Sequence, residues 1–214
     1  MFDIMMGWTN APEEQLQRAF ASARRSVSLD PSSAFGRLAM GATYMTAGDH
    51  ANASKHFRRG LEINPEEPNL LAGAAKSLAF EGAGSKAIEF GNRALRQSPN
   101  PPDWYLWNLG IANYFTEHHD EAIALFHKAV AENLEASLFL IGSYIRSDRK
   151  ADAELHAEEI FQGDPSFHIA RYMDRTTFAN PSDMQALTSD LLAAGMNENV
   201  SFPCVLEPSV ENCR

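Results

Sequence analysis

Side chains that could hold a metal ion gather at two places in this chain of 214 residues. Residues 117–120 read Glu-His-His-Asp, and His156 stands three residues before Glu159. A structural zinc ion needs four converging nitrogen or sulfur ligands. The first group falls in a turn between helix-like segments, where neighbouring side chains diverge, and the second places two ligands on one helix face with no evident third. We therefore predict no metal and no cofactor, and interpret these histidines as surface and turn residues.

The residue patterns of covalent and acid–base catalysis are missing. The sequence contains no Gly-x-Ser-x-Gly turn and no phosphate-cradling glycine loop, and a turn between helices explains Gly82 and Gly84. The acidic residues follow helix faces instead of forming an isolated pair in apolar surroundings, which general acid–base chemistry would need. The sequence therefore predicts a protein that is not an enzyme.

Composition and charge argue against nucleic acid and membrane as partners and indicate the cellular compartment. The formal net charge is −10, whereas a nucleic-acid-binding surface requires clustered basic residues. No apolar run approaches the roughly 18 residues that a membrane-spanning helix needs. Asp3 stands where a signal peptide would be basic, and Cys204 and Cys213 lie in the final tail rather than in a disulfide framework. We expect a cytoplasmic protein that binds neither nucleic acid nor membrane.

Prolines and alanines recur along the chain at a nearly constant interval. Pro31, Pro65 and Pro99 follow helix-like segments and are 34 residues apart, and Pro165 follows a further one. An alanine column with spacings of 34, 34, 35 and 31 residues runs through Ala19, Ala53, Ala87, Ala122 and Ala153. Such a period is the signature of tetratricopeptide (TPR) repeats, antiparallel helix pairs that bury their apolar faces by stacking on their neighbours. The columns resemble the TPR family over residues 12–166.

We predict an all-α fold, a TPR α-solenoid in which antiparallel helix pairs form a right-handed superhelix closed by a C-terminal capping helix. The capping helix is expected to start at Asn180 and Pro181, a cap followed by proline at the first helical position, and to stop at Gly195. The expected units are an incomplete N-terminal repeat over residues 1–32, four repeats over 33–66, 67–100, 101–133 and 134–166, capping helices over 167–196 and a tail over 197–214.

Small residues recur in both helices of the expected pairs. Gly41 and Gly110 of first helices are expected to face Ala53 and Ala122 of second helices, which lets the two helix axes approach closely. Large residues such as Phe57 are expected to fill the wider space between successive pairs. Proline is expected to end the second helices that precede Pro31, Pro65, Pro99 and Pro165, because it lacks the N–H group that continuation requires, whereas Leu134 stands where the repeat over 101–133 should have its closing proline.

Two shorter stretches carry a narrower resemblance. Residues 101–110 read PPDWYLWNLG, and residues 191–196 read LLAAGM, following the Asn-Pro-Ser-Asp of 180–183. Both are similar to segments of the C-terminal TPR regions of bacterial class III adenylate/guanylate cyclases and related regulators. In that family the cyclase chemistry lies in a separate N-terminal domain, which nothing in this chain matches. The resemblance implies an accessory, regulatory role and transfers no catalytic residue.

The first helices of TPR repeats line the concave face, and here their projected side chains are mostly apolar and aromatic. The expected groove consists of Phe35, Leu38, Met45, Lys76, Phe80, Trp104, Trp107, Ile111, Tyr114, Phe115 and Arg146. Only Lys76 and Arg146 are basic, so the basic cluster with which co-chaperone TPR domains hold a peptide carboxylate is missing. An aromatic groove suits the apolar stripe of a helix or an extended apolar segment. Trp104 and Trp107 serve equally well as core residues beside the proline loop.

The sequence leaves three functions open. The first is a non-catalytic, regulatory protein-interaction scaffold that binds a helix or apolar peptide segment of an unidentified protein partner in the groove. The second is a homo-oligomerisation module, in which residues 1–8 or the groove contact a second copy to form a homodimer. The third is a detached or truncated C-terminal regulatory region of a nucleotide cyclase.

Overall fold

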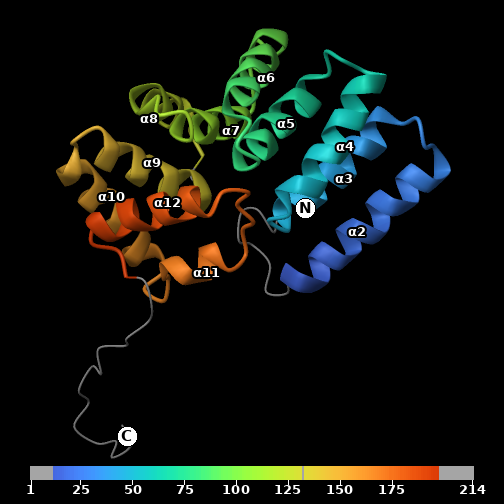
Figure 1. The fold of residues 1–214 in the computed structure, drawn as a ribbon. Coiled ribbons are helices and arrows are strands. Elements are labelled where there is room, and N and C mark those ends of the chain that lie inside the picture. Colours follow the sequence, from blue (N-terminus) through green and yellow to red (C-terminus); the bar gives the residue numbers. More distant parts are fainter. Residues whose placement is uncertain (1–11, 132, 198–214) are drawn as a thin grey trace, which may run out of the picture.

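The computed structural model describes residues 12–131 and 133–197, and every element of regular secondary structure in those ranges is an α-helix. The helices form a curved array that starts with α2 and ends with α12 (Figure 1). Their bounds are α2 (Pro12–Leu29), α3 (Ala34–Thr46), α4 (His50–Ile63), α5 (Pro68–Phe80), α6 (Gly84–Gln97), α7 (Asp103–Tyr114), α8 (His119–Lys128), α9 (Leu134–Arg146), α10 (Lys150–Gly163), α11 (Ile169–Met173) and α12 (Pro181–Ala193).

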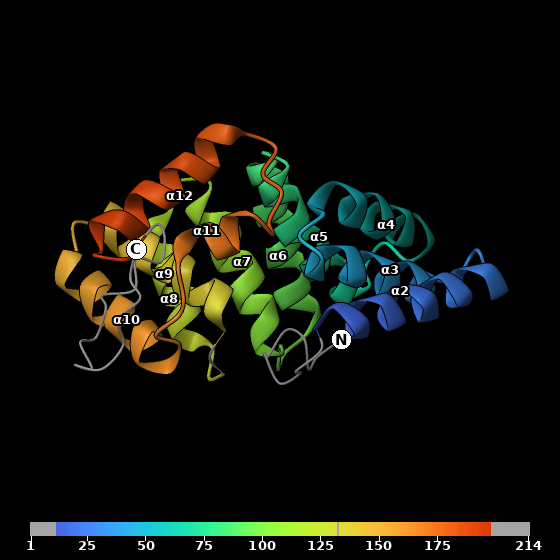
Figure 2. The same cartoon turned by 90° about the horizontal axis from the view of Figure 1, so that it is seen from below.

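Successive helices pack as pairs, and the pairs stack. Helix α3 packs against α4, α5 against α6, α7 against α8 and α9 against α10, while the first helices of neighbouring pairs also touch (Figures 1 and 2). This arrangement confirms the predicted all-α solenoid. The limits assigned to each repeat stay predictions. The partner helix that α2 was expected to find in residues 1–8, and the two cysteines of the tail, lie outside the described residues.

Proline fixes where the second helices end, as the sequence predicts. Helices α2, α4, α6 and α10 each end two residues before the proline of their repeat, at Leu29, Ile63, Gln97 and Gly163. The residue before a proline is pushed out of the helical region by the proline ring, and the proline itself donates no hydrogen bond. The capping helix also starts as expected at Pro181, although the Asn180 amide donates to Asp183 Oδ2 at 3.1 Å instead of capping a backbone N–H.

The close approach within a pair has a different cause from the one expected. The nearest atoms to a β-carbon placed on Gly41 belong to the Phe57 ring, at 2.6 Å, and not to Ala53. A β-carbon placed on Gly73 of the following pair would meet the same ring at 2.5 Å. A phenylalanine on the second helix therefore lies between two glycine-lined first helices. Gly110 and Phe126 form the same contact within their own pair, where a β-carbon placed on Gly110 would lie 2.6 Å from the Phe126 ring.

The C-terminal helices fold back along the array instead of extending it. Helix α12 packs against α9, and both views show the chain between α11 and α12 turning back towards α5 (Figures 1 and 2). Residues 174–180, which we call the arm, form this return. The Leu187 and Leu191 side chains of α12 are fully buried, as the apolar stripe predicts, whereas Leu192 is 43% exposed.

The described helices can also be compared with what membrane crossing and metal binding require. No helix in residues 12–131 and 133–197 combines the length and the apolar character needed to cross a membrane. Across the same ranges no three His, Cys, Asp or Glu side chains lie together as metal ligands would. His156 Nδ1 contacts Glu159 Oε2 at 2.7 Å, one turn away on the same helix.

Candidate partner-binding site

The structure separates the expected groove residues into two groups. Six are buried, with exposed fractions of 8% or less: Met45, Lys76, Phe80, Trp107, Ile111 and Tyr114. Five are partly or largely exposed: Phe35, Leu38, Trp104, Phe115 and Arg146. Phe35, at 75% exposure, stands far outside the core. The expected groove is therefore not an open channel, and a C-terminal segment covers it at Phe80.

The arm docks on the turn between α3 and α4 and on the end of α5, that is, on the turns inside the first two helix pairs. The Thr177 N–H donates to the Gly48 carbonyl at 3.0 Å, and the Ala179 N–H donates to the Phe80 carbonyl at 3.0 Å. The backbone also comes very close at Gly48, where a β-carbon would lie 1.8 Å from the Arg175 carbonyl oxygen. Only a glycine can accept the arm at this position. The concave side thus holds an extended segment through its main chain.

Four phenylalanines form an aromatic cluster where the arm docks: Phe178 of the arm itself, and Phe80, Phe115 and Phe139 of the first helices and their ends. The Phe178 ring of the arm lies 5.0 Å from that of Phe80 and 6.2 Å from that of Phe115, measured between centroids. Phe80 also meets Phe115 at 5.1 Å and Phe139 at 5.8 Å, both edge to face. Such pairs contribute about 0.5–1.5 kcal/mol each beyond the area they bury. Phe178 therefore anchors the arm by packing its aromatic ring against those of Phe80 and Phe115.

A buried polar network lies beside the aromatic cluster. Lys76 forms an ion pair with Glu135 of α9, two helix pairs away, and the Tyr172 hydroxyl donates to the other Glu135 oxygen at 3.0 Å. Burial, reinforced by the Glu135 charge, raises the pKa of Tyr172 well above its ordinary value. Lys76 is therefore held within the fold and is not presented to a partner.

A second network fastens the capping helix. Asp190 of α12 is 4% exposed, and its Oδ2 accepts hydrogen bonds from the Tyr114 hydroxyl at 2.7 Å and from Arg146 Nε at 2.8 Å. Burial, together with the Asp190 charge, raises the pKa of Tyr114, which stays protonated and remains a donor. The Arg146 charge is thereby neutralised by a carboxylate of the same chain.

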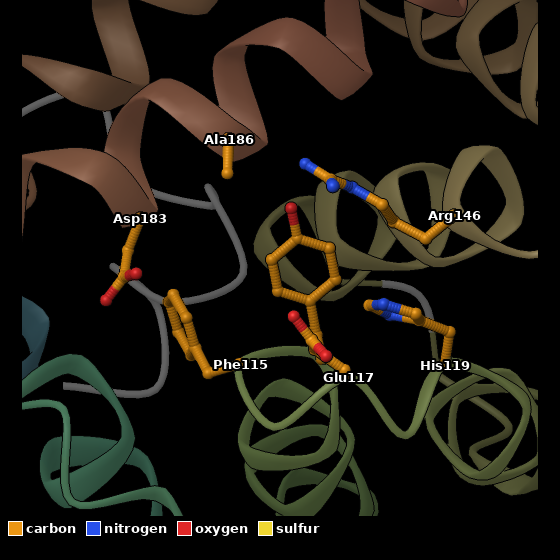
Figure 3. A pocket seen from close by; sticks show the side chains of 7 residues that line it. Phe115, Glu117, His119, Arg146, Asp183 and Ala186 are labelled. Carbon is orange, nitrogen blue, oxygen red and sulfur yellow. The ribbon is translucent and has the colours of Figure 1, made fainter.

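An open cavity remains between the capping helix and the α7–α8 turn, with a volume of about 110 Å³. We call it the cap cavity. It is lined by Tyr114, Phe115, Glu117, His119, Arg146, Asp183 and Ala186. Figure 3 shows Glu117 and His119 rising from the α7–α8 turn, Arg146 reaching in from α9, and Asp183 and Ala186 descending from α12.

Sequence reasoning found part of this site. Tyr114, Phe115 and Arg146 were expected in the groove and do line the cap cavity. Glu117 and His119 entered the sequence analysis only as metal-ligand candidates. Asp183 and Ala186 were missed, because the sequence indicates that α12 is a cap but gives no direction in which it folds back.

Stability is expected to fall in mildly acidic solution because of His50. This residue is 2% exposed and stacks on Phe80 at 3.9 Å, and burial followed by the Lys76 charge lowers its pKa well below the ordinary 6.5. The unfolded chain then binds more protons below pH 6.5, so stability that is complete above that pH is lost as the pH falls. His56 and His119, whose pKa values are also lowered by burial, act in the same direction.

Urea unfolding at about pH 7 and about pH 5 measures this loss, since carboxyl groups with a lowered pKa titrate below that window. Substitution His50→Leu removes the buried imidazole and is expected to reduce the loss. An equal loss in wild type and variant would show that His50 does not titrate differently on folding.

Comparison with known proteins identifies the fold. Residues 37–67 match the family model of the tetratricopeptide repeat. A tetratricopeptide repeat protein from Parabacteroides merdae superposes with a TM-score of 0.56 at 14% identity, covering 84% of this chain and 79% of that one. The fold is a TPR solenoid. The structure of PilW, described as a widely conserved type IV pilus biogenesis factor, is equally similar, with a TM-score of 0.59 at 16% identity over 85% of this chain and 82% of PilW.

One curated relative is similar in sequence. The cytochrome c-type biogenesis protein CycH of Pseudomonas aeruginosa is 28% identical over 142 residues, which cover 60% of this chain and 35% of CycH. The matched part thus spans about a third of the length of that relative.

Proposed function

We propose that this TPR chain is a non-catalytic protein-interaction scaffold that holds an apolar segment of a partner protein on its concave side. One observation carries the proposal: that side already holds an extended segment, the arm, through two main-chain hydrogen bonds and the aromatic ring of Phe178. The same features, a main-chain ladder and a pocket for an alternate side chain, are used by proteins that bind extended peptides. The partner segment takes the place of the arm.

The way in which the arm is held favours its replacement. None of the residues 174–180 is buried, and Phe178, its deepest anchor, is only half-buried. A segment with few buried apolar contacts and solvent-exposed backbone belongs to the least stable part of a fold. A partner that offers an aromatic side chain and two backbone N–H groups can therefore make the same contacts as the arm and compete with it for the site.

The relatives supply the setting of the proposal. CycH and PilW are both named for biogenesis, and we extend to this chain a role in the assembly of another protein. Neither relative is named as a nucleotide cyclase. The homodimer alternative depended on residues 1–8, which lie outside the described residues.

The arm itself provides the probe that tests this function. A labelled peptide with the sequence of residues 171–181 is added to the full chain carrying Phe178→Ala and to wild type. We expect the variant to bind the peptide more tightly, because its own arm competes less well, and a peptide with alanine in place of the phenylalanine to bind neither chain. A partner captured from native extract by the variant should be released by the peptide.

Equal, undetectable binding of the peptide to both chains would overturn the proposal. Trp104→Ala serves as a second variant, since Trp104 of α7 is half-buried and packs against the hydrophobic core beside this site. Trp107 does not serve this purpose. It is 8% exposed, so its truncation would test core packing instead of binding.

A further inference from the structure

The wall of the cap cavity carries negative charge that the fold leaves uncompensated. Arg146 is the cationic residue of the lining, and its charge is already paired with Asp190. Burial lowers the pKa of His119, so the imidazole is neutral near pH 7. The carboxylates of Glu117 and Asp183 form no ion pair with any cation in the described part of the chain. A positively charged group is therefore the ligand that this wall attracts.

The remaining walls also suit a cation. Phe115 and Tyr114 contribute aromatic rings that meet edge to face at 5.6 Å, and Ala186 closes the upper side (Figure 3). An ammonium or guanidinium group over an aromatic face is attracted by the ring quadrupole. Its aliphatic stem can lie against the same ring while the charge reaches the carboxylates. Carboxylates and aromatic rings together recognise a lysine or arginine side chain.

The backbone at Glu117 adopts a left-handed conformation that recurs in the turns of the helix pairs. Gly48, Gly82, Glu117 and Asp148 occupy the same turn position in successive helix pairs, with left-handed φ values of 76°, 77°, 63° and 56°. Glycine adopts this conformation without steric penalty, whereas other residues are strained. At the first two turns the arm covers the glycine; at the third, α12 has begun and the cap cavity stands open. Glu117 places a carboxylate in that opening at the expense of backbone strain.

We propose that the cap cavity binds a basic side chain, lysine or arginine, of the partner segment. Phe115 belongs both to the aromatic cluster and to the cavity wall, so a segment that replaces Phe178 brings its neighbouring residues to the cavity. The identity of the ligand as part of a partner rests on the proposed function. The cation preference of the cavity does not, and it is tested separately.

The test uses the full chain and two small probes, N-acetyl-lysine N-methylamide and its uncharged analogue N-acetyl-norleucine N-methylamide. Titration is followed by the NMR shifts of the Glu117 amide and the Ala186 methyl group. We expect the lysine probe to give saturable shifts at both positions and the norleucine probe to give none. Glu117→Gln and Asp183→Asn are each expected to weaken lysine binding about two- to fivefold, as for partly exposed ion pairs, and added salt should weaken it further.

A matched pair of glycine variants separates binding from a structural role. Glu117→Gly and Asp148→Gly relieve the same left-handed strain, so both are expected to raise the melting temperature. Only Glu117→Gly should lose affinity for the lysine probe, because Asp148 does not line the cavity. Equal affinity in both variants, or equal shifts with the norleucine probe, would overturn the cation site while leaving the scaffold function untouched.

Discussion

Replacing Phe57 by alanine is expected to lower the free energy of unfolding by about 3–5 kcal/mol, the usual range for a fully buried phenylalanine. The side chain is 0% exposed, and its ring fills the space above Gly41 of its own helix pair and Gly73 of the next. Its removal leaves a cavity between two pairs that glycine cannot close. The stability of a solenoid is approximately the sum of the intrinsic stability of each repeat and the stability of each interface between repeats, and this substitution lowers both contributions.

Chemical unfolding of wild type, Phe57→Ala and Phe35→Ala measures this effect. Phe35 is the matched control, a phenylalanine of the neighbouring helix that is 75% exposed, and its truncation should change stability by no more than about 0.5 kcal/mol. Similar losses in the two variants would contradict the assignment of Phe57 to the inter-repeat core.

The contact between Phe57 and Gly73 predicts that the effects of substitutions at these two positions on stability are strongly coupled. Gly73→Ala alone is expected to destabilise by about 1–3 kcal/mol, because the added methyl group meets the Phe57 ring at 2.5 Å. In the Phe57→Ala background that methyl group enters the new cavity and should cost little or even stabilise. Additive losses, in place of a coupling term, would mean that the two residues do not share one space.

Features that repeat along the chain could be predicted from the sequence. The helix ends before Pro31, Pro65 and Pro99, the burial of the alanine column from Ala53 to Ala153 and the solenoid itself all follow from local rules applied at a fixed period. The partner of Gly41 could not be predicted in the same way. A glycine signals close approach but not which side chain approaches, and two columns, Ala53 and Phe57, were both compatible with the period.

Features that occur once could not be predicted. The return of the arm depends on contacts between residues far apart in the chain, such as Thr177 with Gly48 and Asp190 with Tyr114. Nothing in the period specifies these contacts, because they join the irregular end of the chain to the repeats. This is why the groove residues Phe80 and Tyr114, correctly placed on first helices, are buried and not open to a partner.

Gly48→Ala is expected to release the arm and to lower the free energy of unfolding by about 2–4 kcal/mol. Two effects contribute to this loss of stability. Alanine is strained at φ 76°, and its β-carbon would lie 1.8 Å from the Arg175 carbonyl oxygen. Because that oxygen is a backbone atom of the arm, it can move away only if the arm does. The hydrogen bond from Thr177 to the Gly48 carbonyl is then lost.

Gly82→Ala isolates the first effect from the second. Gly82 has nearly the same φ, 77°, but the nearest atom to its β-carbon is the Asn180 side-chain amide at 2.9 Å, which can rotate aside. This variant should therefore lose only the strain term, about 1–2 kcal/mol, and keep hydrogen-exchange protection at Thr177. Gly48→Ala should lose that protection, and it should bind the arm peptide no better than wild type does, because the Arg175 carbonyl of the peptide would meet the same β-carbon. Equal protection of Thr177 in both variants would show that Gly48 does not hold the arm. Because the arm occupies the site at which we place the partner, release of the arm from this turn could then not control access to the aromatic cluster.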